Sequence, residues 1–254
     1  MIDATNPKTF PIELREIVHT RLSEIPKIEL DKIRKSTIAH EGDVTLALEK
    51  YLSPSFAYSM YQDELIPIFR QYEIMCFHAT RVGSFDTIKS EGLVSDIEKY
   101  KCYLHDFLLT EKVAADRTQL AIKCIANEYN RKYGNNPHQI CFFTNYCSLH
   151  DNDGYAAYDQ FYETVGGELA NWALEEKMPD VLSILRKKGH PAIVKFMIPF
   201  EKVAEYHQDC LIYPFVLAVA AEELWNYKYI IEADSSLIGD VPPTSILEII
   251  PIEN

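Results

Sequence analysis

The side chains best suited to chemistry stand in two short blocks of the sequence. The first block is His78-Ala79-Thr80-Arg81, which directly follows an apolar run typical of a buried strand. An imidazole, a hydroxyl and a guanidinium fork at the end of a strand suit a cleft that binds a pyrophosphate. The structural alternative for His78 is an ordinary hydrogen-bonded histidine of the core.

The second block is Gly166-Gly167-Glu168. The chain contains only 9 glycines among 254 residues, so a Gly-Gly step beside a carboxylate predicts a tight turn that aims Glu168. The structural alternative is a plain turn between helices, with Glu168 near the positive end of a helix dipole. Tyr155 and Tyr158 precede the block at helical spacing. Each of them can either stack on a planar ligand or pack in the core.

The charge and the cysteines argue against several classes of protein. A formal net charge of −13 argues against a general binder of nucleic-acid phosphates, which needs a positive surface. No pair among the 6 cysteines has the C-x-x-C spacing of a zinc ribbon or a redox motif. We therefore expect all of them to be reduced and none to bind a metal. Cys76 and Cys141 lie within apolar runs, where a thiol is usually inert.

The pattern of apolar residues changes near residue 74. Before it they recur at helical spacing, so we expect residues 1–73 to form helices that pack on a body of residues 74–254. In the body, short strands interleave with helices, which predicts an α+β fold with a small antiparallel or split sheet. The expected strands cover residues 74–79, 139–144, 192–198, 227–232 and 246–252, and the expected helices cover 84–92, 96–133 with Thr110 as a cap, and 179–189.

The cellular location of the protein is predicted from the signals that the sequence lacks. The first residues do not show the basic and apolar regions of a secretory signal. No apolar run reaches the length of a membrane span. We therefore expect a cytoplasmic protein that does not partner with a membrane.

The order of the blocks resembles that of the ADP-ribosyltransferase superfamily. One strand ends in Phe77-His78-Ala79-Thr80-Arg81, a second ends in Cys141-Phe142-Phe143-Thr144, and a Tyr-rich segment leads to Gly166-Gly167-Glu168. The superfamily includes diphtheria-toxin-like toxins and poly(ADP-ribose) polymerases, and the chain is also similar to bacterial proteins with HATR and GGE blocks. The resemblance covers roughly residues 74–252. It implies a sheet of the ADP-ribosyltransferase type and NAD as the substrate, without a metal.

The resemblance also implies contacts between individual residues and NAD. His78 would bind the ribose on the nicotinamide side, and the backbone of Ala79 would contact the carboxamide group of nicotinamide. Thr80 would lie beside them. Tyr155 or Tyr158 would stack on the nicotinamide ring.

The catalytic residues that the resemblance implies are Glu168 and His78. Glu168 would bind the ribose 2′-hydroxyl and orient the nucleophile. In many members of the superfamily the glutamate stands beside a late strand, which makes Glu222 and Glu223 the alternatives. Arg81 and Thr144 would contact NAD in the branch that combines a first-strand arginine with a Ser/Thr motif.

Three functions compete at this stage. The first is an NAD-dependent mono-ADP-ribosyltransferase of the toxin or effector type, with a macromolecular acceptor and a neutralising antitoxin as partners. The second is RNA 2′-phosphotransfer with NAD, for which Arg81, Arg117 and Arg131 are the candidate phosphate ligands. The third is an acidic binding module or antitoxin-like inhibitor without catalysis, whose charge steers it onto a basic partner.

Overall fold

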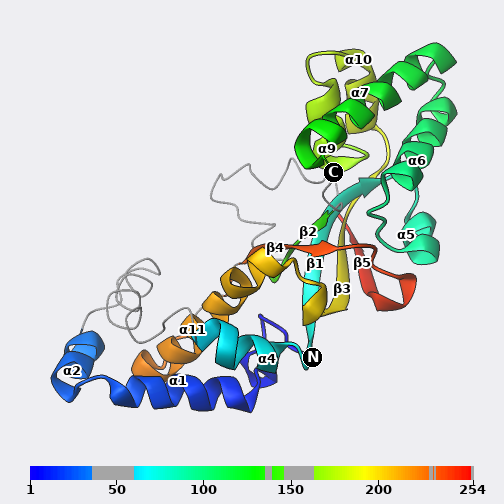
Figure 1. Ribbon diagram of the computed structural model, residues 1–254. Coiled ribbons are helices and arrows are strands. Elements are labelled where there is room, and N and C mark those ends of the chain that lie inside the picture. The colour runs from blue at the N-terminus through cyan, green and yellow to red at the C-terminus, as the bar shows by residue number, and fades with distance from the viewer. Residues whose placement is uncertain (36–59, 135–138, 146–162, 229–230, 232, 253–254) are drawn as a thin grey trace. The chain divides into compact units, whose positions relative to one another are not determined.

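The computed structural model describes residues 1–35, 60–134, 139–145, 163–228, 231 and 233–252. The fold is α+β, which confirms the predicted class (Figure 1). The chain divides into two compact units, the first made of Met1–Met75 with Pro199–Ser235 and the second of Cys76–Ile198 with Ser236–Asn254. The segment 199–235 therefore groups with the N-terminal helices, and not with the body of residues 74–254 to which we assigned it.

The first unit is helical, and its longest helix explains this grouping. α11 (Gln208–Trp225) is apolar on most of its circumference and buries the majority of its side chains. α1 (Ile12–Glu24) packs along it and buries Leu14, Val18 and Leu22. No helix among the described residues is long and apolar enough to cross a membrane. The unit also contains α2 (Lys27–Lys35), the π-helical turn η2 (Met60–Leu65) and α4 (Ile66–Phe69).

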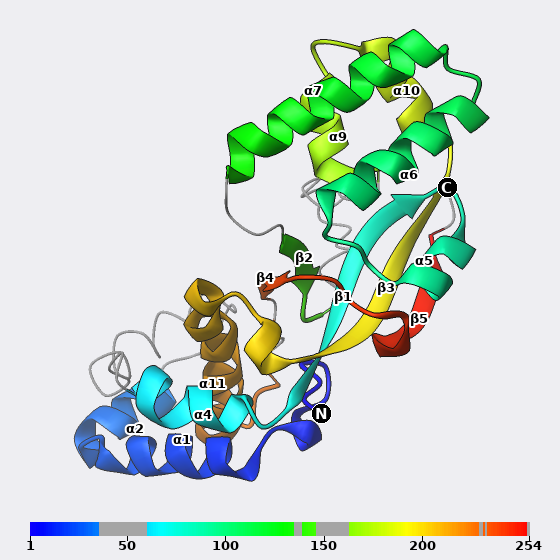
Figure 2. The ribbon, with the colours of Figure 1, turned by 45° about the vertical axis from the view of Figure 1, so that its right-hand side comes forward.

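A five-stranded sheet runs in the order β4-β2-β1-β3-β5. β1 pairs with β2, and β3 pairs with β5, both antiparallel (Figure 2). Four strands agree with the expected ones apart from their ends, whereas the ADP-ribosyltransferase type of the sheet stays a prediction. The bounds are β1 Glu73–Val82, β2 Gln139–Phe143, β3 His190–Pro199, β4 Asp234–Ile238 and β5 Ile246–Pro251.

The strand expected at residues 227–232 is wrong as far as the chain is described there. Tyr227, Lys228 and Ile231 are not in a strand, and β4 begins later, at Asp234. Its two serines are buried, with Ser235 3% and Ser236 2% exposed. The Ser236 hydroxyl donates a hydrogen bond to the Gln139 side chain over 3.0 Å. Hydrogen bonding lets a polar segment occupy a buried strand, and an apolar pattern does not reveal this.

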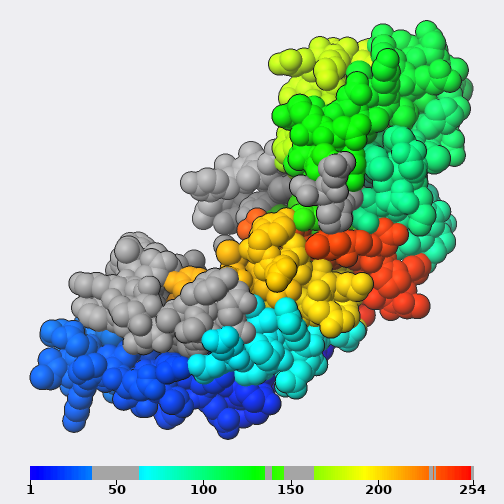
Figure 3. Space-filling view, viewed as in Figure 1, coloured from blue at the N-terminus to red at the C-terminus, as the bar shows by residue number. Residues whose placement is uncertain are grey.

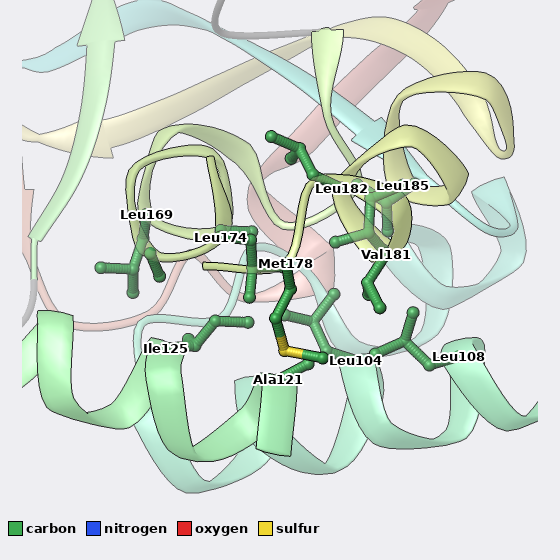
Figure 4. Packing of buried hydrophobic residues seen from close by; sticks show 13 residues of the cluster. Leu104, Leu108, Ala121, Ile125, Leu169, Leu174, Met178, Val181, Leu182 and Leu185 are labelled. Atoms are coloured by element: carbon green, nitrogen blue, oxygen red, sulfur yellow. The ribbon is translucent and has the colours of Figure 1, made fainter. Parts of the chain in front are cut away.

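Helices of the second unit gather beyond the C-terminal end of β1 (Figures 1 and 2). In the space-filling view, α6, α7 and α10 form one continuous surface (Figure 3). Figure 4 shows the core between them, where Leu104 of α6, Ile125 of α7 and Leu174 of α9 lie around the Met178 side chain. The bounds are α5 Phe85–Glu91, α6 Ile97–Thr110, α7 Ala115–Tyr133, α9 Gly167–Leu174 and α10 Pro179–Lys187.

The expected helix over residues 96–133 is two helices, and the expected role of Thr110 as a cap is wrong. Thr110 is the last residue of α6, and its hydroxyl donates to the Asp106 carbonyl oxygen over 2.9 Å. Lys112 then adopts a φ of +64°, which breaks the helix because this backbone region is incompatible with continued helical hydrogen bonding. α7 begins after Ala114 without a side-chain cap.

Thr118 of α7 offers a test of this core. Its side chain is fully buried, and its hydroxyl has no hydrogen-bond partner among the described residues. Thr118→Val keeps the shape and removes the unsatisfied hydroxyl, so we expect the free energy of unfolding to rise by about 1 kcal/mol in urea denaturation. The control is Thr164→Val, because the buried Thr164 hydroxyl contacts Asn171 Oδ1 at 3.5 Å. If both variants change stability equally, the hydroxyl of Thr118 is not the cause.

Candidate functional site

A cavity of about 230 Å³ lies within the second unit. The C-terminal half of β1, the residues around Gly92, one face of α6, the start of β2 and the start of α9 form its walls. The structure thus brings the His78 block and the Gly166-Gly167-Glu168 block to one cavity, while their catalytic and NAD-binding roles stay predictions. The polar side chains of the lining are His78, Thr80, Arg81, Thr87, Glu91, Lys99, Tyr100, Tyr103, Tyr133, Gln139 and Glu168.

The Gly-Gly step is required by the backbone. Gly166 has a φ of +88° and Gly167 a φ of +62°, which side chains of L-residues rarely tolerate. A Cβ on Gly166 would also lie 2.7 Å from the Tyr100 hydroxyl, whereas one on Gly167 would meet open space. The turn starts α9 at Gly167 and so places Glu168 in the first helical turn, with 27% of its side chain exposed.

Tyr100 of α6 fixes this turn. Its hydroxyl donates a hydrogen bond to the Gly166 carbonyl oxygen. Burial raises the pKa of Tyr100 well above its ordinary value, and the neighbouring Tyr133 acts in the same direction. The phenol therefore stays protonated and keeps donating at any physiological pH.

The Glu168 carboxylate forms an ion pair with the last turn of α7. Its Oε2 lies 3.3 Å from Lys132 Nζ. The same ammonium lies 3.9 Å from the centroid of the Trp172 ring. Lys132 and Trp172 do not line the cavity, so Lys132 contacts Glu168 from outside its wall, and Trp172 contacts Lys132.

His78 is held in one orientation by the neighbouring strand. Its Nδ1 lies 2.7 Å from the Cys141 carbonyl oxygen. A carbonyl oxygen can only accept, so Nδ1 carries the proton and Nε2 of the neutral ring is an acceptor. Burial lowers the pKa of His78, and the hydrogen bond to Cys141 opposes this only in part. At neutral pH the site therefore presents a neutral imidazole.

The lowered pKa of His78 makes folding sensitive to acid. The folded protein binds the proton more weakly than the unfolded chain, whose histidines titrate near about 6.5. The stabilising contribution is thus complete above that pH and is lost as the pH falls through the lower pKa of the folded state. His78→Asn removes the titration and keeps a donor for Cys141. In urea denaturation between neutral pH and about pH 5, we expect this variant to lose less stability than the wild type; equal losses would contradict the assignment.

Arg81 lines the cavity, but part of its guanidinium group donates hydrogen bonds to the backbone. The residue is 8% exposed, and its Nη1 donates to the carbonyl oxygens of Lys188 and Gly189, both at 3.3 Å. These carbonyls immediately precede β3. Burial lowers the pKa of Arg81, although the nearby Glu163 charge opposes the shift. Ala79 and Thr80 also line the cavity, whereas Thr144 is fully buried and is not part of the lining.

Among the described residues, the tyrosines that line the cavity are Tyr100 and Tyr103 of α6 and Tyr133 of α7. Sequence reasoning did not single them out, because aromatic residues at helical spacing are more often core residues than ligand contacts. The spacing of Tyr100 and Tyr103 does place them on one face of α6, but nothing in the sequence indicates that this face lines a cavity. Tyr155 and Tyr158, the expected stacking residues, lie outside the described residues.

The alternative glutamates belong to the first unit. Glu222 of α11 pairs with Arg15 of α1 at 2.8 Å, and Glu223 lies 3.2 Å from His19 Nδ1. Neither lines the cavity of the second unit. Among the described carboxylates, Glu168 and Glu91 are the ones that line it.

The two cysteines that we expected to be inert differ in their surroundings. Cys76 is fully buried, and burial raises its pKa well above the ordinary value. Cys141 is exposed and lines the cavity, so the expectation that it is enclosed in an apolar strand is wrong. The alternation of β2 explains the difference, since Ile140 and Phe142 point to the buried face and Cys141 to the other.

Comparison of the chain with protein-family models, curated proteins and solved structures finds no match. A functional assignment must therefore rest on the geometry and chemistry of the cavity.

Proposed function

We propose that the protein is an NAD-dependent mono-ADP-ribosyltransferase and that the cavity of the second unit binds NAD. The observation that carries the proposal is the shared cavity of Glu168 and His78, which belong to different elements, α9 and β1, and lie far apart in the sequence. These are the side-chain types that cleavage of NAD needs. The first is a carboxylate on a fixed helix start, and the second is a neutral imidazole with an acceptor nitrogen.

The chemistry of NAD cleavage gives the Glu168 carboxylate a role. As the bond between nicotinamide and ribose breaks, nicotinamide leaves with the electron pair and positive charge develops on the ribose. A preorganised negative group beside the ribose stabilises that transition state. The acceptor nucleophile then bonds to the ribose carbon and gives up its proton. Glu168 supplies the negative charge, and the imidazole of His78 accepts a hydrogen bond from a ribose hydroxyl.

The cations of the lining favour the pyrophosphate of a dinucleotide. Arg81 and Lys99 are both part of the cavity wall. RNA 2′-phosphotransfer is less well supported, because its other candidate ligands do not line the cavity. Arg117 pairs with Asp180, and Arg131 pairs with Glu128 at 2.5 Å.

Incubation with NAD labelled on the adenylate part, together with a cell lysate, tests the proposal. We expect label to enter protein or nucleic acid and free nicotinamide to be released. NAD should also raise the melting temperature at concentrations above its dissociation constant. Transfer of the phosphate of a 2′-phosphorylated RNA to the ADP-ribose part of NAD, with release of nicotinamide, would favour the phosphotransferase. An absence of both labelling and stabilisation by NAD would favour a non-catalytic binding module and would end the proposal.

A further inference from the structure

Glu168 is held by a cation that is itself held by an aromatic ring. Lys132 Nζ lies 3.3 Å from Glu168 Oε2 and 3.9 Å from the centroid of the Trp172 ring. The ring of the adjacent Tyr133 lies 5.3 Å from the same ammonium. One ammonium thus joins a carboxylate of the cavity wall to two aromatic faces.

The ion pair between Lys132 and Glu168 is too exposed to act mainly by stabilising the fold. The side chains of Lys132 and Glu168 are 31% and 27% exposed, and pairs of this kind contribute little to folding. A lysine side chain loses conformational entropy when it pairs with a carboxylate, because several of its rotatable bonds become fixed. Contact with an aromatic face compensates for part of this loss because the ring attracts the cation. The arrangement therefore restricts the lysine and, through it, the carboxylate.

The carboxylate needs such a restraint. Glu168 stands in the first turn of α9, where two glycines precede it and where its own side chain has several rotatable bonds. The turn fixes the backbone through Tyr100, but it does not fix the carboxylate. Among the described residues, Lys132 is the ion-pair partner of Glu168.

We propose that Lys132, seated on the Trp172 ring, is a positioning residue that holds the Glu168 carboxylate at the cavity wall. This inference rests on the proposed function for its catalytic consequence. Lys132 acts through Glu168 alone. Misplacement of a catalytic group by a fraction of an ångström to an ångström lowers the rate without weakening substrate binding to the same extent.

The kinetic test compares variants of both partners. Lys132→Met should lower kcat for NAD cleavage about tenfold and change KM by less than about twofold. Lys132→Arg should keep most of the activity, because a guanidinium can contact both the carboxylate and the ring. Trp172→Leu should fall between the two. The matched control is Arg117→Met, which removes a different ion pair of α7, the one with Asp180, and should leave kcat unchanged.

A double-mutant cycle separates positioning from a structural effect. In the Glu168→Gln background, Lys132→Met should cause no further loss of kcat, because the carboxylate on which it acts is gone. Melting temperatures of all variants should stay within about 2 °C of the wild type. Wild-type activity in Lys132→Met, or a further tenfold loss in the Glu168→Gln background, would overturn the inference.

A second readout is independent of NAD turnover. The chain has 2 tryptophans, so in a Trp225→Phe background Trp172 is the only reporter. An ammonium over the indole alters its emission. Glu168→Gln should therefore change the emission of Trp172 when Lys132 is present and should not change it in Lys132→Met. A wild type without NAD turnover that shows this coupling would end the proposed function and leave the positioning intact. An emission that is indifferent to Glu168→Gln would overturn the positioning.

Discussion

Glu168→Gln is expected to lower the rate of NAD cleavage by about 10²–10³ while the fold stays intact. Glutamine keeps the shape of the side chain and removes the negative charge that, in the proposed reaction, stabilises the positive charge developing on the ribose. The loss of stability should be small, since the ion pair with Lys132 that disappears is partly exposed. The measurements are single-turnover release of nicotinamide and thermal denaturation of the same preparations.

Three controls make this result specific. Glu175→Gln changes a carboxylate directly after α9 that does not line the cavity, and it should leave the rate unchanged. Glu222→Gln and Glu223→Gln change the alternative glutamates of the first unit and should also be active. Full activity of Glu168→Gln combined with inactivity of either of the latter variants would show that the catalytic glutamate lies on α11. Equal activity of all four would remove the case for a catalytic carboxylate.

Gly92→Ala should cause the largest loss of stability. Gly92 follows α5 with a φ of +80°, and a Cβ there would lie 1.9 Å from the Val241 carbonyl oxygen. That carbonyl accepts the Leu93 amide at 3.0 Å, and the Val241 amide donates back to Leu93 at 2.9 Å. Alanine must therefore break this bridge or move the chain. Together, backbone strain and overpacking cost about 3–5 kcal/mol, a large part of the stability of a typical domain.

The control for Gly92→Ala is Gly239→Ala. Gly239 has a similar φ of +93°, but a Cβ there would meet nothing within 4 Å. Urea denaturation should show a loss of only about 1–2 kcal/mol, due to backbone strain alone. Because Gly92 also lines the cavity, its variant should lose NAD binding under conditions in which Gly239→Ala still binds. Similar losses of stability in both variants would show that contact with Val241 does not matter.

The sequence predicted those parts of the site whose signal is local. A polar block after an apolar run indicated the end of β1, and scarce glycines indicated the turn before Glu168. The close approach of Tyr100 to Gly166 explains why glycine stands there. Lys132 and Trp172 could not be found in this way, because a charged and an aromatic residue on two helices become neighbours only through tertiary packing.

The parts of the fold that the sequence did not predict depend on contacts between segments far apart in the chain. The run from Leu211 to Ala221 is strongly apolar, which indicates a buried element but does not indicate the segment against which it packs. α11 packs on α1, nearly two hundred residues earlier in the chain. β4 was misplaced for a similar reason, since the hydrogen bond between Ser236 and Gln139 makes its burial possible.

The two-segment composition of each unit has a consequence for synthesis on the ribosome. The first unit needs the segment Pro199–Ser235, and the second needs Ser236–Asn254. Neither unit can therefore reach its final set of contacts until residues beyond Pro199 have emerged, and α1 must wait for α11 with its apolar face uncovered. Val241, whose backbone pairs with Leu93 beside Gly92, emerges much later than these residues. A nascent chain thus carries Glu168 well before Val241 can hold the backbone beside Gly92, a residue of the cavity wall, so this part of the wall is fixed only after residue 241 has emerged.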